Sequence, residues 1–259
     1  MKKLLFISLC LPFIGFGQFT LKTYVPDDNF ENHLEANSMG DGIALNDSVN
    51  TLSVEMLMSL DVSNENISDL TGIEDFTSLL MLKCYSNPLT SIDVSNNIYL
   101  TDLRCQSNQL ISLDVGQNTA LKTLFCFSNF LTSLDVSNDT ALKELHCQDN
   151  QLTNLDLKNG NNTNMPFTIS FNATNNPNLY CINVDDVSWS TANWTVANDN
   201  INTQHYFSNN CTSTEIEEYN ANKGILKIID FLGRETKQTN QPLFYIYDDG
   251  TVEKRIVIE

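Results

Sequence analysis

Apolar and polar positions along the middle of the chain recur with a period of about 21 residues, a length typical of the repeats that build solenoids. Three sets of positions share this period: Leu82, Leu103, Leu124 and Leu145; Cys84, Cys105, Cys126 and Cys147; and Asn87, Asn108, Asn129 and Asn150. In a solenoid each repeat forms one coil. The pattern therefore predicts the architecture before any single residue is considered.

The leucine and cysteine sets predict one short strand in each repeat. Leu82 and Cys84 face inward in such a strand, while Lys83 and Tyr85 face outward, because successive side chains point to opposite faces. One repeat cannot bury its own apolar residues, so the coils must stack and pair their strands as a parallel sheet, about 4.8 Å apart. Inward cysteines in one row behave as small hydrophobic residues and cannot offer zinc a tetrahedral site.

Two polar rows also follow the period. Each Asn stands where the chain turns inward after a strand, so we expect a structural ladder in which its amide bonds the backbone of adjacent coils. One carboxylate per coil is predicted in a second row, formed by Asp61, Asp93, Asp114, Asp135 and Asp156. Bonds to turn amides and solvent are expected to offset the repulsion in this row, with bound calcium as the alternative, and we predict no metal.

The repeats fit one consensus, L-x-x-L-x-C-x-x-N-x-L. The matching segments are LLMLKCYSNPL, LTDLRCQSNQL, LKTLFCFSNFL and LKELHCQDNQL. This consensus resembles that of the leucine-rich repeats. The resemblance implies an α/β-class right-handed solenoid of five or six coils, mostly short parallel strands and turns with little helix. A degenerate first repeat contains Leu60 and Val62 where Leu82 and Cys84 stand.

Both ends of the array depart from the consensus, which is typical of capping segments. On the N-terminal side, Asp28 and Glu31 have the spacing of a capping box for a short helix, with Phe30 and Leu34 inward.

On the C-terminal side, Trp189 and Trp194 are expected to cover the last coil. Cys181 and Cys211 lie outside the repeats and are predicted to form a disulfide in an oxidising compartment.

The chain is thus expected to divide into five parts. These are a signal peptide at 1–18, an N-terminal cap at 19–56, leucine-rich repeats at 57–179, a disulfide-linked C-terminal cap at 180–211, and a small all-β domain at 212–259.

The first residues have the pattern of a secretory signal peptide. Lys2 and Lys3 precede an apolar run, Leu4–Phe16, which is too short for the roughly 20 residues of a membrane-spanning helix. We expect cleavage near Gly17 or Gln18, no transmembrane segment, and a secreted or surface-attached product.

Acidic residues dominate the charge, with 32 Asp and Glu against 14 Lys and Arg. Loss of two lysines with the signal peptide changes the net charge from −18 to −20. Nucleic acid is excluded as a partner, because phosphate binding needs a basic surface.

Three segments resemble the secreted leucine-rich-repeat proteins of flavobacteria: VPDDNFENHL, SLDVSNDTALKELHCQDNQLTNLDL and NPNLYCINVDDVSWSTANW. The tail ILKIIDFLGRETKQTNQPLFYIYDDGTVEKRIVIE resembles the C-terminal sorting domains of type IX secretion cargo in the same phylum. This resemblance implies that residues 212–259 contact the secretion machinery. The tail's own pattern predicts a hairpin over 244–247 and 252–258, and an ordinary small β domain is the alternative.

No set of residues in the sequence suggests catalysis. The three histidines, His33, His146 and His205, lie in different regions, and the chain has no nucleophile elbow, phosphate-binding glycine loop or C-x-x-C pair. We therefore predict a protein that is not an enzyme and needs no cofactor.

Function is expected on the outward face of the stacked strands, which forms a continuous surface. The candidate ligand-binding residues there are Lys83, Tyr85, Arg104, Phe125, Phe127 and His146. Exposed aromatic side chains and Arg suit either a protein or a glycan ligand. One alternative is that the phenylalanines reflect strand propensity or contact a terminal segment folded back over the sheet. Another is that the chain is a structural or adhesive spacer. We expect the chain to be a monomer.

Overall fold

The computed structural model describes residues 21–165, 169–211, 225–229, 242–247 and 252–256. The chain divides into two compact units, residues 1–211 and residues 212–259, which we describe separately. The predicted signal peptide and its cleavage point lie outside the described residues.

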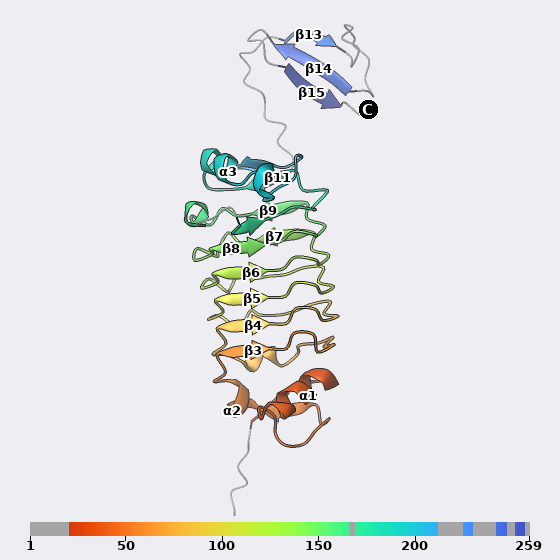
Figure 1. Ribbon diagram of the computed structural model, residues 1–259, viewed down its shortest axis with the longest axis vertical. Coiled ribbons are helices and arrows are strands. Elements are labelled where there is room, and N and C mark those ends of the chain that lie inside the picture. Colours follow the sequence, from red (N-terminus) through yellow and green to blue (C-terminus); the bar gives the residue numbers. More distant parts are fainter. Residues whose placement is uncertain (1–20, 166–168, 212–224, 230–241, 248–251, 257–259) are drawn as a thin grey trace, which may run out of the picture. The chain divides into compact units, whose positions relative to one another are not determined.

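The first unit is a stack of coils with one parallel sheet running along its length (Figure 1). Six strands pair in this first sheet: β3 (Ser59–Asp61), β4 (Met81–Lys83), β5 (Asp102–Arg104), β6 (Thr123–Phe125), β8 (Glu144–His146) and β10 (Phe171–Asn172). Leu60 of the degenerate first repeat pairs with Leu82, so this repeat joins the sheet in register. The fold is the solenoid that the sequence period predicts.

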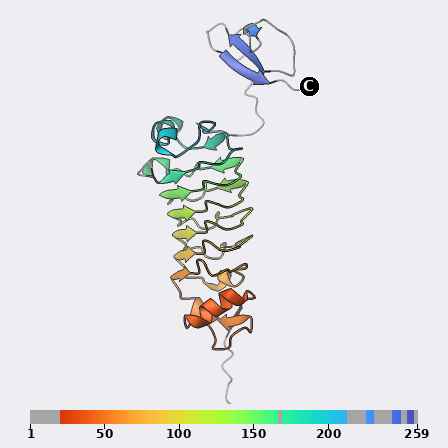
Figure 2. The same ribbon diagram turned by 45° about the vertical axis from the view of Figure 1, so that its right-hand side comes forward.

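A second parallel sheet lies on another side of the coils (Figure 2). Its strands are β7 (Ser133–Asp135), β9 (Asn154–Asp156), β11 (Cys181–Asn183) and β12 (Tyr206–Ser208). Ile182 pairs with Leu155 on one side and Phe207 on the other. Coil stacking therefore continues beyond residue 179, where the sequence placed the end of the repeats.

The interior between the sheets is filled by the leucines and cysteines of the repeats. Cys84, Cys105, Cys126 and Cys147 have no exposed surface and carry free thiols. Burial raises the pKa of all four thiols, and those of Cys105 and Cys147 reach about 12. Since the thiolate is the reactive form, these cysteines act as core residues.

The asparagine ladder ties each coil to its neighbours. The Nδ2 of Asn129 donates to the carbonyl oxygens of Cys105 at 3.0 Å, Cys126 at 3.1 Å and Phe127 at 3.3 Å. Its Oδ1 accepts from the backbone N–H of Leu110 at 3.0 Å. Asn87, Asn108 and Asn150 make equivalent bonds in their own coils.

Asn176 is a fifth member of the ladder that the sequence pattern did not identify. Its Nδ2 donates to the carbonyls of Cys147 and Ala173, each at 3.1 Å, and its Oδ1 accepts from Leu152 N–H. The step from Asn150 to Asn176 exceeds the period, because the chain between them is longer than in the other repeats. The sequence feature that could have identified this residue is the segment from Phe171 to Asn176, where Phe171 and Ala173 stand at the usual positions of Leu and Cys.

The N-terminal cap contains two antiparallel strands and two short helices. These are β1 (Lys22–Tyr24), α1 (Asp28–Ala36), β2 (Ser48–Asn50) and α2 (Thr51–Val54). A 3-10 helix, η1 (Ile73–Asp75), lies in the first coil. Phe30 and Leu34 of α1 are fully buried, as expected.

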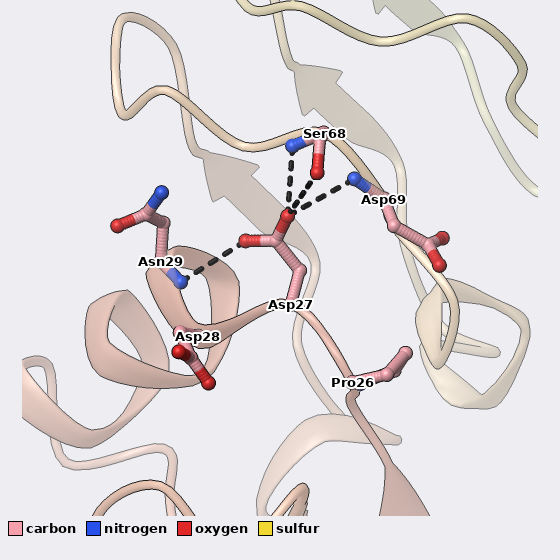
Figure 3. Close-up of a pocket in the computed structure, with 6 residues that line it drawn as sticks. All are labelled: Pro26, Asp27, Asp28, Asn29, Ser68 and Asp69. Atoms are coloured by element: carbon pink, nitrogen blue, oxygen red, sulfur yellow. Dashed lines mark hydrogen bonds between the residues drawn. The ribbon is translucent and has the colours of Figure 1, made fainter.

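The capping box predicted at Asp28 and Glu31 was wrong. Asp27 caps α1, since its Oδ1 accepts from Phe30 N–H at 3.0 Å. Its other oxygen accepts from the N–H and hydroxyl of Ser68, each at 2.8 Å, and so joins the cap to the first coil (Figure 3). Burial would raise the pKa of Asp27, but hydrogen bonds from Ser68, Phe30 and Asp69 outweigh it and lower that pKa.

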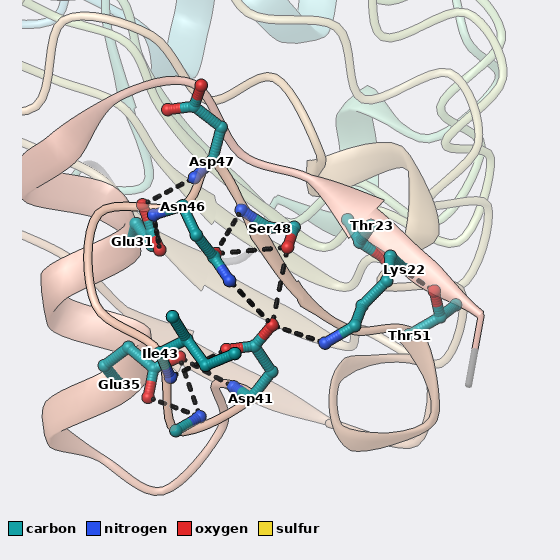
Figure 4. A network of polar contacts seen from close by, with 11 residues as sticks. Lys22, Thr23, Glu31, Glu35, Asp41, Ile43, Asn46, Asp47, Ser48 and Thr51 are labelled. Atoms are coloured by element: carbon teal, nitrogen blue, oxygen red, sulfur yellow. Dashed lines mark hydrogen bonds and ion pairs between the residues drawn. The ribbon is translucent and has the colours of Figure 1, made fainter. Parts of the chain in front are cut away.

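Glu31 instead holds the loop between α1 and β2. Its two carboxylate oxygens accept from the N–H groups of Asn46 at 2.9 Å and Asp47 at 3.1 Å (Figure 4). In the same loop, the carboxylate of Asp41 accepts from Lys22 Nζ and from Asn46 Nδ2. Glu31 bonds backbone N–H groups of a loop that is distant in sequence, and a motif read from adjacent residues could not predict this contact.

The C-terminal end of the first unit contains α3 (Val187–Asn193) and two 3-10 helices, η2 (Asn162–Asn164) and η3 (Val196–Asn198). Trp194 is 1% exposed, and its ring lies 4.5 Å from that of Phe171 and 5.9 Å from that of Phe207, between centroids. The predicted disulfide between Cys181 and Cys211 is confirmed, with 5.7 Å between their Cα atoms. No helix in the described part of the chain is long and apolar enough to cross a membrane.

The second unit contains a three-stranded antiparallel sheet. Its strands are β13 (Ile225–Ile229), β14 (Pro242–Tyr247) and β15 (Val252–Ile256). β14 and β15 pair where the sequence predicts a hairpin, while its turn and its last residues lie outside the described residues.

Candidate functional site

The outward side of the first sheet, which we call the strand face, brings residues of successive coils into columns. The register of β3, β4, β5, β6 and β8 aligns Asp61, Lys83, Arg104, Phe125 and His146. Four of these five residues are polar or charged. The strand face therefore presents polar groups to solvent, while the same strands bury their leucines.

Three neighbours in this column form a stack. The Arg104 guanidinium carbon lies 4.9 Å from the centroid of the Phe125 ring. On the other flanking strand, the His146 ring stacks on Phe125 with 4.6 Å between centroids and 30° between planes. Cation–π and ring stacking therefore order three side chains from three coils.

Further bonds hold both ends of the stack. Arg104 donates to Asp102 twice, from Nε to Oδ1 at 2.9 Å and from Nη2 to Oδ2 at 3.0 Å, and these bonds raise the pKa of Arg104. His146 Nε2 lies 2.9 Å from the Ile169 carbonyl oxygen and 3.7 Å from Glu144 Oε1. The stack is preorganised before any ligand arrives.

Phe125 and Phe127, which we expected to be exposed, are half-buried. Arg104 from β5 and His146 from β8 both pack against the Phe125 ring, which accounts for its burial. Phe127 lies 6.3 Å from Phe125, centroid to centroid, at an angle of 51°.

A second column of the strand face contains Tyr85, Gln106, Phe127 and Gln148, which the backbone bonds between turns place in line. The Oε1 atoms of Gln106 and Gln148 are buried without a hydrogen-bond partner.

Lys83 lies at the N-terminal end of the strand face and pairs with Asp61 at 3.4 Å. This contact corrects the predicted acidic row, because Asp61 belongs to the first sheet and aligns with Lys83. Asp135, from an identical Ser-Leu-Asp segment, belongs to the second sheet and aligns with Asp156. The same three residues therefore occupy two different sides of the coil.

The remaining acidic row contains one carboxylate in each of four coils. Each carboxylate accepts from the backbone N–H two residues later, at 2.8–2.9 Å: Asp93 from Ser95, Asp114 from Gly116, Asp135 from Ser137 and Asp156 from Lys158. Hydrogen bonds from Ser95 lower the pKa of Asp93. Turn amides stabilise these charges, as expected.

The N-terminal cap has two further polar clusters. Asp28, Glu31 and Asp47 offer oxygens within 4.8 Å of one another, but both oxygens of Glu31 already accept backbone amides. The open pocket in Figure 3 lies beside Asp27, whose two carboxylate oxygens already accept hydrogen bonds from the first turn of α1 and from Ser68.

The three histidines occupy separate places. His33 lies in α1, 3.3 Å from Glu65 Oε1, and His146 lies on the strand face. His205 is buried near the Asn176 carbonyl in the C-terminal end of the first unit, and burial lowers its pKa. The described histidines therefore do not converge on one site.

No family model matches the chain. Among curated proteins, it is 40% identical over 74 residues to internalin J of Listeria monocytogenes, a match spanning 29% of this chain and 8% of that protein. Among solved structures, it resembles the functional domain of internalin J, which includes a cysteine ladder, with a TM-score of 0.52 and 32% identity. That match covers 63% of this chain and 38% of the domain. A second match, to the internalin InlF of Listeria monocytogenes, covers 64% of this chain and 53% of that protein, with a TM-score of 0.47 and 23% identity. The matches to internalin J support a leucine-rich-repeat solenoid, and the chain spans 8% of internalin J and 38% of its solved domain.

Proposed function

We propose that this leucine-rich-repeat protein is a secreted or cell-surface recognition protein without catalytic activity. Its binding surface is the strand face, with Lys83, Tyr85, Arg104, Phe125, Phe127 and His146 as contact residues. The observation that carries the proposal is the Arg104–Phe125–His146 stack, which bonds to Asp102 and to the Ile169 carbonyl hold in place. Preorganised aromatic and Arg side chains suit binding, because little conformational entropy is lost on contact.

The packing around the Phe125 ring favours a protein partner over a glycan. A sugar ring stacks on the face of an aromatic ring, but the Phe125 ring already stacks with Arg104 and His146. The guanidinium N–H groups of Arg104 that do not bond Asp102 suit acceptor groups of a polypeptide.

Substitution on the strand face should weaken this binding. We expect Phe125→Ala and Arg104→Ala each to weaken binding by at least about tenfold, the range of interface hot spots, since each removes a member of the stack. The measurement is titration against the ligand that the full chain selects from arrays of extracellular proteins and glycans.

The matched control is Ile111→Ala, which removes an apolar side chain that is 65% exposed in the loop after β5. If ligand affinity is the same in all three variants and the wild type, the strand face is not the binding surface and the chain is better described as a spacer.

We further propose that the chain is of the flavobacterial type and that residues 212–259 direct its export by type IX secretion machinery, after an N-terminal signal peptide. The support is the sequence resemblance of the tail, together with the paired strands β13, β14 and β15. Removing residues 212–259 should trap the protein in the periplasm of its native cells. Fractionation with an antibody against the repeats measures this.

Fusion of residues 212–259 to a periplasmic reporter is the control for a loss of stability caused by truncation. The reporter should reach the surface or medium. Unchanged export of the truncated chain would make the tail an ordinary β domain.

A further inference from the structure

A second row of buried polar side chains runs through the coils, away from the asparagine ladder. It contains Asn97, Asn118, Asp139 and Asn159, which recur at nearly the same period as the strands. Their exposed fractions are 0%, 0%, 0% and 5%. We call this row the second ladder.

The amides of the second ladder act as hydrogen-bond donors to backbone carbonyls. Asn118 Nδ2 donates to the carbonyl oxygens of Val94 at 3.0 Å and Asn97 at 2.9 Å. Asn97 makes two equivalent bonds to its preceding coil, and Asn159 Nδ2 donates to the Asp139 carbonyl at 3.2 Å. Each of the three Asn members thus donates to carbonyls of the coil before it.

Asp139 breaks this rule. Its backbone follows the turn of Asn118, because Asp139 N–H donates to Val136 O as Asn118 N–H donates to Val115 O. Asn97 and Asn118 each bond the carbonyls 24 and 21 residues before them, so by analogy we expect the Asp139 carboxyl group beside the Val115 and Asn118 carbonyls. Both carboxyl oxygens are buried and have no hydrogen-bond partner.

A carboxylate cannot donate to these carbonyls, whereas a protonated carboxyl group can donate to one of them. We propose that Asp139 is a proton-binding position that carries a proton in the folded protein. Loss of this proton weakens the contact between the coil that begins with β5 and the coil that begins with β6. These two coils carry Arg104 and Phe125, so the proton-dependent contact joins the same coils as the strand-face stack.

The charges around Asp139 support proton uptake. Burial, followed by the negative charge of Asp135, raises the pKa of Asp139 to about 7. Its ladder neighbours Asn118 and Asn159 carry no charge.

The sign of the pH effect follows from the raised pKa. Below about pH 4 the carboxyl group is protonated in both folded and unfolded chains, so the full stabilisation is present. Between about pH 4 and pH 7 the unfolded chain loses its proton while the folded chain keeps it. The unfolding equilibrium constant therefore rises by up to about tenfold per pH unit and levels off above pH 7.

Other groups act in different windows or with opposite sign. Asp27, Asp41, Asp61 and Asp93 have lowered pKa values, so their stabilisation is lost as pH falls below about 4. The lowered pKa of His205 makes stability increase with pH in the acidic range. These contributions cancel when the unfolding constants of the wild type and of Asp139→Asn are compared at the same pH.

The test is urea unfolding of the full chain and of Asp139→Asn from pH 4 to pH 8.5. The Asn variant restores the amide donor and lacks the titrating group. We expect the ratio of wild-type to variant unfolding constants to grow at least about tenfold between pH 4 and pH 7. Asp135→Asn, the matched control, should keep the pH dependence but move its midpoint to lower pH.

The carboxyl carbon of Asp139 also reports its protonation directly by NMR. Its resonance, assigned by its loss in Asp139→Asn, should titrate with a midpoint near pH 7 in the folded chain. Parallel pH profiles for wild type and Asp139→Asn, or a carboxyl midpoint below pH 5, would overturn the proposal.

Discussion

Asn129→Ala should lower the free energy of unfolding by about 3–5 kcal/mol, because one buried N–H left unpaired costs about 1–3 kcal/mol and each of the three lost bonds to carbonyls costs about 0.5–1.5 kcal/mol. The side chain is 4% exposed, so water cannot replace it. Its removal leaves the N–H of Leu110 without its side-chain partner in the middle of the array, while the carbonyl of Cys105 loses one of two amide donors and keeps Asn108. Urea unfolding measures the loss, provided that the transition stays cooperative.

Asn138→Ala is the control, since Asn138 lies on the surface of the same coil. This variant should change the free energy of unfolding by less than about 0.5 kcal/mol. Equal effects of the two substitutions would mean that the asparagine ladder adds little to stability and that apolar stacking alone holds the coils.

Trp194→Ala should destabilise the C-terminal end of the first unit by about 3–5 kcal/mol, the usual cost of deleting a buried Trp side chain. The ring fills the space beside Phe171 and Phe207 and meets Trp189 edge-on at 5.3 Å between centroids. In a solenoid each coil contacts only its neighbours, so the damage should remain local. Amide hydrogen exchange should accelerate in β10, β11 and β12 and remain slow in β4 and β5.

The control is Val196→Ala in η3, where the side chain is 45% exposed. Uniform loss of protection along all strands of Trp194→Ala would contradict the prediction, because it would show that the coils unfold as one unit whatever the site of damage.

The repeat itself could be predicted because a solenoid is built from contacts one period apart in sequence. Leu82 and Leu103 occupy equivalent positions, so the spacing between them specifies which strands pair. The period failed at Asn176, where a longer connection shifts the position while the hydrogen bonds stay the same. Regular spacing thus identified four residues of the asparagine ladder, but a residue outside the period can make the same hydrogen bonds.

The candidate site was only partly predictable. The column of Arg104, Phe125 and His146 follows from the period, but the stacking of these side chains depends on their rotamers and on Asp102. Exposure was overestimated for Phe125 for the same reason.

By itself, the sequence determined the coil length, the inward leucines and cysteines, the asparagine ladder and the pairing of the two cysteines outside the array. These features depend on burial and spacing, which repetition makes visible. Only the tertiary structure decided that Asp61 and Asp135 lie on different sides of the coil, that Glu31 binds the loop before β2, and that both carboxyl oxygens of Asp139 are buried without a hydrogen-bond partner. Each of these depends on groups distant in sequence that meet at one point, and a polar side chain acquires its partner only when the coils have stacked.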